Sequence, residues 1–158
     1  MRDAEEKLTK VHVSFGARGG ESMWAKEIEG DLFAIRNLPF FAFGLNFGDI
    51  VLAPQIAGLR EVQAVVRPSG HRTLRLVFGD HVTQPEQRLF LDALQKLGGT
   101  YERGTKRLVA IDVPPVADFD AMLVTLDRCE AAGELTFETC EARAPGSFDD
   151  AAQTDSAA

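Results

Sequence analysis

The order of hydrophobic patterns over residues 73–141 constrains the fold more than any other feature of the chain. Alternating apolar residues predict a strand over 73–78, a hairpin of two strands over 100–103 and 106–113, and a last strand over 134–141. Helical spacing predicts one helix after the first strand and another before the last. The order strand, helix, strand, strand, helix, strand predicts a ferredoxin-like lobe, in which both helices cover one face of an antiparallel sheet.

The two predicted helices carry clear start and stop signals. Thr83-Gln84-Pro85-Glu86 has the form of a capping box with proline in the first turn, and Gly98-Gly99 ends the helix that it opens. Asp118 can cap the second helix, and Gly133 is well placed at its C-terminal end. Each helix has a single apolar stripe. Covering one face of a sheet explains both stripes without a ligand.

The first half of the chain reads as short strands separated by glycine and proline turns. Strands are predicted over 10–15, 22–28, 31–37, 50–53 and 60–67, with no convincing helix. This pattern predicts a small β-barrel-like lobe, so that the whole chain is α+β. The predicted divisions are a flexible N-terminus (1–9), the β lobe (10–68), the ferredoxin-like lobe (69–143) and a disordered acidic tail (144–158).

A run of aromatic and glycine residues over 37–49 connects two of the predicted strands. It contains Phe40, Phe41, Phe43 and Phe47 and has no helical period, so we expect it to be folded in rather than solvated. These rings fill the core of the first lobe or, together with the single tryptophan upstream, form an apolar recess for a partner. The sequence leaves both interpretations open.

Composition excludes several classes of function. The net charge is −7, and residues 10–72 hold seven basic and six acidic residues, so no basic face supports nucleic-acid binding. The strand over 106–113 also lacks the aromatic residues with which such sheets stack on RNA. No apolar run is long enough to span a membrane, and we expect a soluble, cytoplasmic protein with Cys129 and Cys140 as free thiols. The histidines and glycines lack the spacing of a metal or cofactor site, so neither group is predicted.

The segment joining the two predicted lobes is the best candidate for a binding site. It combines a flexible glycine with cationic and hydroxyl side chains, which suit a carboxylate or a phosphate. We predict that an inter-lobe groove binds an anionic small molecule or an acidic peptide, without catalysis. The alternative is a turn whose arginine stems cover apolar surface. The predicted ligand-binding residues are Asn37, Asp49, Arg67, Ser69, His71, Arg72 and Arg75.

Two other functions remain open. The chain could be a protein-interaction module of the inhibitor or immunity type, whose acidic second lobe masks a basic target through Asp118, Asp120, Asp127 and Glu130. A hydrolase is a distant third, with Ser69 as nucleophile, His71 as base and Asp49 as the group that orients it. The sequence assigns no catalytic residue and does not fix the oligomeric state.

Several motifs in this order resemble one bacterial family. They are Glu21-Ser22-Met23-Trp24, then Asn37-x-Pro39-Phe40 with Phe41-Ala42-Phe43-Gly44, then Phe47-Gly48-Asp49-Ile50-Val51, then Ser69-Gly70-His71-x-Thr73-x-Arg75. Together they resemble the domain-of-unknown-function family numbered 4265, over roughly Val11 to Cys140. The resemblance supports the boundaries of the folded region and implies no particular chemistry.

Overall fold

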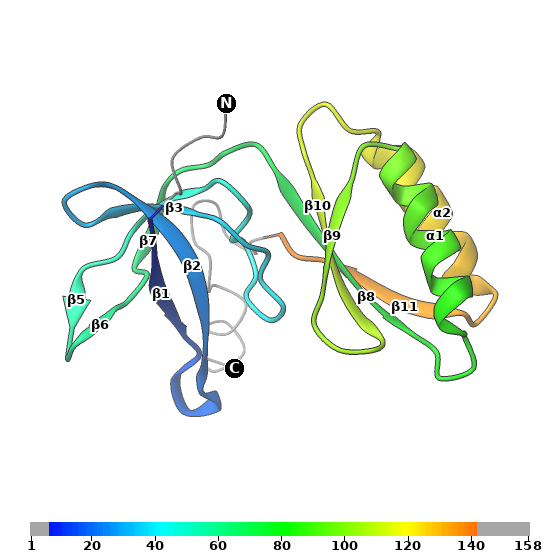
Figure 1. Ribbon diagram of the computed structural model, residues 1–158, viewed down its shortest axis with the longest axis horizontal. Helices are drawn as coiled ribbons and strands as arrows, with labels where there is room; N and C mark the ends of the chain where they lie inside the picture. Colours follow the sequence, from blue (N-terminus) through cyan, green and yellow to red (C-terminus); the bar gives the residue numbers. More distant parts are fainter. Residues whose placement is uncertain (1–6, 142–158) are drawn as a thin grey trace, which may run out of the picture. The chain divides into compact units, whose positions relative to one another are not determined.

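The computed structural model describes residues 7–141, which form a mixed α+β fold with eleven strands in three sheets and two α-helices (Figure 1). They divide into two compact units. The N-terminal unit comprises residues 7–69 with Glu141, and the C-terminal unit comprises Gly70–Cys140. Most of the predicted flexible N-terminus and the whole predicted acidic tail lie outside the described residues. Neither helix of the described region is long and apolar enough to cross a membrane.

The N-terminal unit is built on a five-stranded antiparallel sheet of order β1-β2-β3-β4-β7. A short 3-10 helix (Gly16–Arg18) separates the first two strands. A two-stranded ribbon, β5 (Gln55–Ile56) with β6 (Leu59–Arg60), interrupts the single strand that the sequence analysis expected over 60–67. The sheet strands are β1 (Leu8–Ser14), β2 (Gly20–Glu29), β3 (Leu32–Ile35), β4 (Ile50–Leu52) and β7 (Ala64–Arg67).

This sheet curls but is not a closed barrel, so the barrel-like prediction was wrong in that respect. Its edge strands are β1 and β7, and they do not pair with each other. The segment just before β7 instead meets β1 at an isolated bridge between His12 and Glu61, where the Val62 N–H donates to the His12 carbonyl at 2.9 Å. Closure would need a continuous ladder between the edge strands, and β7 has only four residues.

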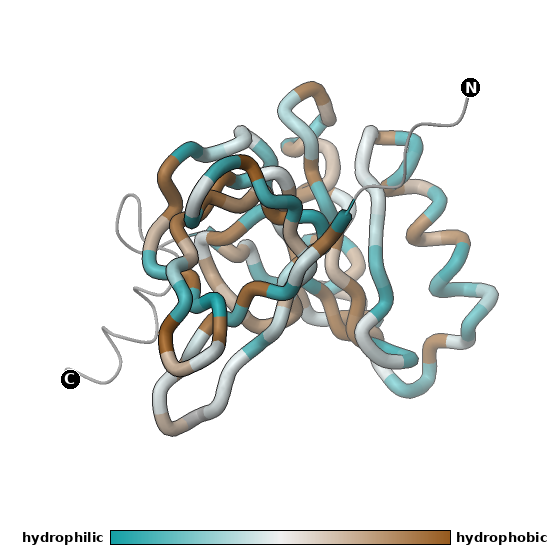
Figure 2. Tube along the Cα trace, turned by 60° about the vertical axis from the view of Figure 1, so that its left-hand side comes forward, coloured by the Kyte–Doolittle hydropathy of each residue, from teal (hydrophilic) through white to brown (hydrophobic). Residues whose placement is uncertain are grey.

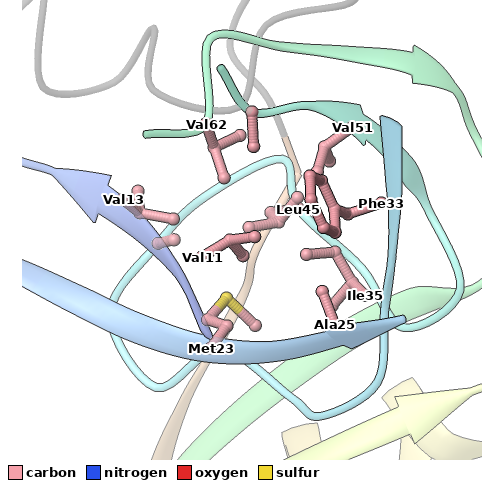
Figure 3. Close-up of a cluster of buried hydrophobic side chains, with 11 residues drawn as sticks. Val11, Val13, Met23, Ala25, Phe33, Ile35, Leu45, Val51 and Val62 are labelled. Carbon is pink, nitrogen blue, oxygen red and sulfur yellow. The ribbon is translucent and has the colours of Figure 1, made fainter. Parts of the chain in front are cut away.

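The core of the N-terminal unit is mainly aliphatic around Phe33, and the connection over 37–49 contributes to it through Ala42 and Leu45. Figure 3 shows Leu45 between Val11 and Phe33, among side chains that come from the strands. The phenylalanines of the connection do not fill this core. Phe41 is 62% exposed, and the other three rings are only partly buried. The prediction that the run folds in therefore holds for its aliphatic positions rather than for its rings.

The C-terminal unit contains β8 (Arg72–Phe78), α1 (Gln84–Lys96), β9 (Thr100–Arg103), β10 (Leu108–Val113), α2 (Phe119–Ala131) and β11 (Leu135–Thr139). The strands form an antiparallel sheet of order β11-β8-β10-β9. Both helices lie on the same face of this sheet (Figure 1). Each of the elements predicted over residues 73–141 is present, in the predicted sequence order.

Local capping and apolar periodicity explain both helices. The Thr83 hydroxyl accepts from the Glu86 N–H while the Glu86 carboxylate accepts from the Thr83 N–H at 3.1 Å, so the predicted capping box is complete. Asp118 accepts from the Ala121 N–H at 3.1 Å and caps α2. Hydrophobic and hydrophilic residues alternate along the helices in Figure 2. The apolar stripes bury Leu91, Leu94, Met122 and Leu126 against the sheet.

Candidate functional site

The seven predicted binding residues are divided between the two units. Asn37, Asp49, Arg67 and Ser69 belong to the N-terminal unit, and the other three belong to the C-terminal unit. The predicted inter-lobe groove stays a prediction, and each group is described within its own unit below.

In the N-terminal unit, the predicted binding residues hold backbone segments together. Asp49 is 2% exposed, and its two carboxylate oxygens accept from the N–H groups of Ser69 at 2.8 Å and Asn46 at 2.9 Å. The Ser69 hydroxyl donates to the Phe47 carbonyl at 2.6 Å. Asn37 accepts from the Trp24 N–H at 2.7 Å through its side-chain oxygen. These contacts give Asp49, Ser69 and Asn37 structural roles that the sequence did not indicate.

Gly48 allows the close approach of the segments that Asp49 joins. Its φ is +84°, and a Cβ atom there would lie 3.1 Å from the Ser69 Cβ. Both the backbone conformation and the contact favour glycine. Arg67 ends β7, lies opposite Ile50 in the sheet and is exposed.

In the C-terminal unit, strand alternation separates the cationic residues onto two faces of the sheet. Arg72 lies opposite Val113, a core residue, and is therefore on the face that the helices cover. Thr73 lies opposite Asp112, and Arg75 lies opposite Ala110, on the other face. Arg72 and Arg75 were both predicted to line one groove, and the pleat of β8 directs them to opposite faces of the sheet.

Within the C-terminal unit, His71 pairs with Asp112. The His71 Nδ1 lies 2.8 Å from an Asp112 carboxylate oxygen, and an ionised Asp112 accepts from Nδ1–H and so fixes the ring tautomer. Arg75 is 3% exposed and lies 3.5 Å from Glu138 on β11. We refer to the two pairs, His71 with Asp112 and Arg75 with Glu138, together as the sheet-face cluster.

Asp112 gives the sheet-face cluster a dependence on pH. Burial raises the pKa of Asp112 above its ordinary value of 3.8, and the hydrogen bond and charge of His71 oppose that rise. At pH values just above 3.8 the folded state therefore binds more protons than the unfolded state. The free energy of unfolding should fall as the pH rises through this window, by the linkage between proton binding and stability.

We expect Asp112→Asn to remove that part of the slope of unfolding free energy against pH. The measurement is denaturant unfolding of the wild type and the variant over a pH series that begins near 3.8. Asp127→Asn, at an exposed position of α2, is the matched control and should keep the wild-type slope. A slope that is equal in wild type and Asp112→Asn would contradict this role.

Arg72 lines a cavity of about 440 Å³ at one end of the C-terminal unit. The cavity lies where β8 begins, β10 ends and α2 begins. The Arg72 guanidinium carbon lies 4.3 Å from the centroid of the Phe119 ring, a cation–π contact. Gly70 has a φ of +89°, and a Cβ atom there would approach Pro115 to 3.1 Å. The lining residues are Gly70, Arg72, Val113, Pro114, Pro115, Ala117, Asp118, Phe119 and Asp120. We name this space the Arg72 cavity.

Of the acids proposed to mask a basic target, two serve local structure. Asp118 caps α2, and Glu130 accepts from the Phe137 N–H at 3.0 Å, where β11 forms an edge of the sheet. Asp120 and Asp127 are exposed. Within residues 7–141, no group of three or more histidine, cysteine, aspartate or glutamate side chains is arranged to hold a metal ion. Cys129 and Cys140 are both free thiols.

Sequence reasoning missed two functional candidates for different reasons. Asp112 could have been found, because alternation over 106–113 places it on the face opposite Val109, Ile111 and Val113. Phe119 was assigned to the apolar stripe of α2, and nothing local indicates that Arg72 packs on its ring. Such pairing depends on how β8 and α2 meet.

Comparisons with known proteins agree with this fold. A model of the domain of unknown function DUF4265 matches residues 21–137. A hypothetical protein from Neisseria gonorrhoeae, known from its crystal structure, shares the fold with a TM-score of 0.74 at 20% identity, over 87% of this chain and 97% of that one. No curated protein sequence matches the chain. The family match spans most of the described residues, and the chain therefore belongs to the DUF4265 family.

Proposed function

We propose that this chain is a non-enzymatic binding protein that takes a carboxylate-bearing small molecule, or the acidic group of a peptide, in the Arg72 cavity. The observation that carries the proposal is the Arg72 guanidinium, held over the Phe119 ring on the wall of a cavity of about 440 Å³. That volume falls in the range of small-molecule pockets, about 300–1,000 Å³. The β-α-β-β-α-β order and the strand order β11-β8-β10-β9 support a ferredoxin-like classification of this unit.

The stacking of Arg72 suits it to carboxylate recognition. A guanidinium carries five N–H donors in one plane, so contact between its face and a ring directs those donors along the edge of the plane. Two of them can reach both oxygens of a carboxylate at once. Stacking also fixes the side chain before the ligand arrives, which lowers the entropic cost of binding.

The two aspartates of the Arg72 cavity limit the charge of the ligand. Asp118 and Asp120 also line this cavity, so a second negative charge on the ligand would be repelled. The apolar lining supplied by Val113, Pro114 and Ala117 favours an aliphatic body. The best-fitting ligand is therefore a monocarboxylate with an apolar group. This is narrower than the anionic class that the sequence predicted.

We expect Arg72→Gln to weaken monocarboxylate binding by about tenfold or more, because a charge-assisted bond of about 1.5–3 kcal/mol is lost. N-acetyl-leucine serves as the probe, with its amide and the dianion N-acetyl-aspartate as comparisons, in titrations followed by amide NMR shifts of the full chain. The acid should bind more tightly than either comparison. Its shifts should centre on residues 113–120.

Arg107→Gln provides the matched control, because Arg107 is an exposed arginine of the same unit outside the Arg72 cavity. This variant should bind N-acetyl-leucine as the wild type does. Equal affinities for the acid and the amide, or equal losses in the Arg72 and Arg107 variants, would reject the proposal.

A further inference from the structure

A second cavity in the C-terminal unit lies away from Arg72, between the loop that follows β8, the first turns of α1 and the loop after α2. Its volume is about 420 Å³. The aromatic part of its wall is ordered by an edge-to-face pair, Phe78 with Phe90, whose ring centroids are 5.8 Å apart at an interplanar angle of 88°. The lining residues are Phe78, His81, Val82, Glu86, Leu89, Phe90, Ala132 and Glu134. We name this space the Phe90 cavity.

Leu89 extends the apolar wall of the Phe90 cavity outward. Its side chain is 72% exposed, although it is a large aliphatic residue in the second turn of α1. Helical periodicity does not require leucine there, because the buried stripe of α1 runs through Leu91 and Leu94. Exposed apolar surface beside an aromatic pocket is typical of a binding site.

The charged residues of the Phe90 cavity favour a cation. Its described lining residues include two carboxylates, Glu86 and Glu134, and the imidazole of His81, but no lysine or arginine. His81 is packed over Gly79, where a Cβ atom would lie 2.6 Å from the imidazole Cε1. The charge available to a ligand at the mouth of this cavity is therefore predominantly negative.

The surroundings of Glu86 explain its charge. Hydrogen bonds from the Thr83 hydroxyl, at 2.7 Å, and from the Thr83 N–H lower the pKa of Glu86. Glu134 adjoins Cys129, and burial together with that carboxylate raises the pKa of the thiol. The thiol thus stays neutral.

We propose that the Phe90 cavity binds an organic ammonium ion with an aromatic or branched apolar body. The apolar body would pack against Phe78, Phe90 and Leu89, and the ammonium group would bind Glu134, with Glu86 adding attraction. A cation can also contact the negative face of a phenylalanine ring. This site is independent of the Arg72 cavity, and the two select ligands of opposite charge.

Three probes of similar size and different charge test this assignment on the full chain: 2-phenylethylammonium, 2-phenylethanol and 3-phenylpropionate. Amide NMR titrations should show the ammonium ion binding about fivefold more tightly than the alcohol, since a partly exposed ion pair adds a modest free energy. The carboxylate should bind most weakly at this position. The shifts should centre on residues 78–90 and 132–134.

Substitutions separate the contribution of charge to ligand affinity from the contribution of apolar contact. Glu134→Gln should bring the affinity for the ammonium ion down to that for the alcohol, while Leu89→Ser should weaken both ligands alike. Asp92→Asn, on the exposed side of α1 and outside the cavity, should leave the preference unchanged. The proposal is overturned if the alcohol binds as tightly as the ammonium ion, or if Glu134→Gln keeps the preference for the cation.

Discussion

Glu21→Ala is expected to lower the free energy of unfolding of the N-terminal unit by about 3 kcal/mol or more, since bonds to a charged acceptor contribute about 1.5–3 kcal/mol each. Its carboxylate accepts three successive backbone N–H groups, those of Phe40 at 2.6 Å, Phe41 at 3.2 Å and Ala42 at 3.1 Å. Alanine would remove the shared acceptor of these donors, close to the core residues Ala42 and Leu45.

Denaturant unfolding followed by tryptophan fluorescence measures this loss, because the chain has a single tryptophan, Trp24, and it lies on the same strand as Glu21. Glu29→Ala is the matched control, at the exposed end of the same strand, and should change stability by less than about 0.5 kcal/mol. If Glu21→Ala behaves like the control, Glu21 does not hold the connection over 37–49 in place.

Asp49→Ala is expected to cost about 3 kcal/mol, because it leaves the N–H groups of Ser69 and Asn46 without their acceptor at a position that is 2% exposed. The same unfolding measurement applies. Asp49→Asn should recover part of the loss, since its side-chain oxygen can still accept one of the two hydrogen bonds.

Asp31→Ala gives the contrasting case for a carboxylate. Asp31 binds Arg60 at 2.6 Å, but its side chain is 49% exposed, and such surface pairs contribute about 0–1 kcal/mol. If Asp49→Ala lowers the free energy of unfolding less than Asp31→Ala does, burial does not determine how much these carboxylates contribute to stability. The expected order also separates a structural role for Asp49 from a role confined to ligand binding.

The sequence predicted best what local chemistry determines. The capping box at Thr83 and the cap at Asp118 involve residues three apart, and the apolar stripes of both helices repeat within a few turns. Likewise, the two strands predicted over 22–28 and 31–37 pair as β2 and β3 across the two-residue connection after Glu29.

Contacts between distant residues were not predictable in this way. Glu21 reaches the backbone of Phe40, and His71 reaches Asp112, across 19 and 41 positions of sequence. The Ser69 hydroxyl likewise reaches the Phe47 carbonyl, which lies far from it in sequence. The pleat of β8 has a similar effect, because Arg72 and Arg75 are three residues apart and therefore lie on opposite faces of the sheet.

The bond between Glu130 and the Phe137 N–H has a consequence for self-association. An edge strand normally has unpaired N–H groups that can hydrogen-bond to an extended segment of another molecule, and such pairing leads to aggregation. At β11 the Glu130 carboxylate, from α2, already accepts the hydrogen bond of one such N–H group. An incoming strand would have to expel a carboxylate before it could dock there, so this border of the sheet resists extension by a neighbouring molecule.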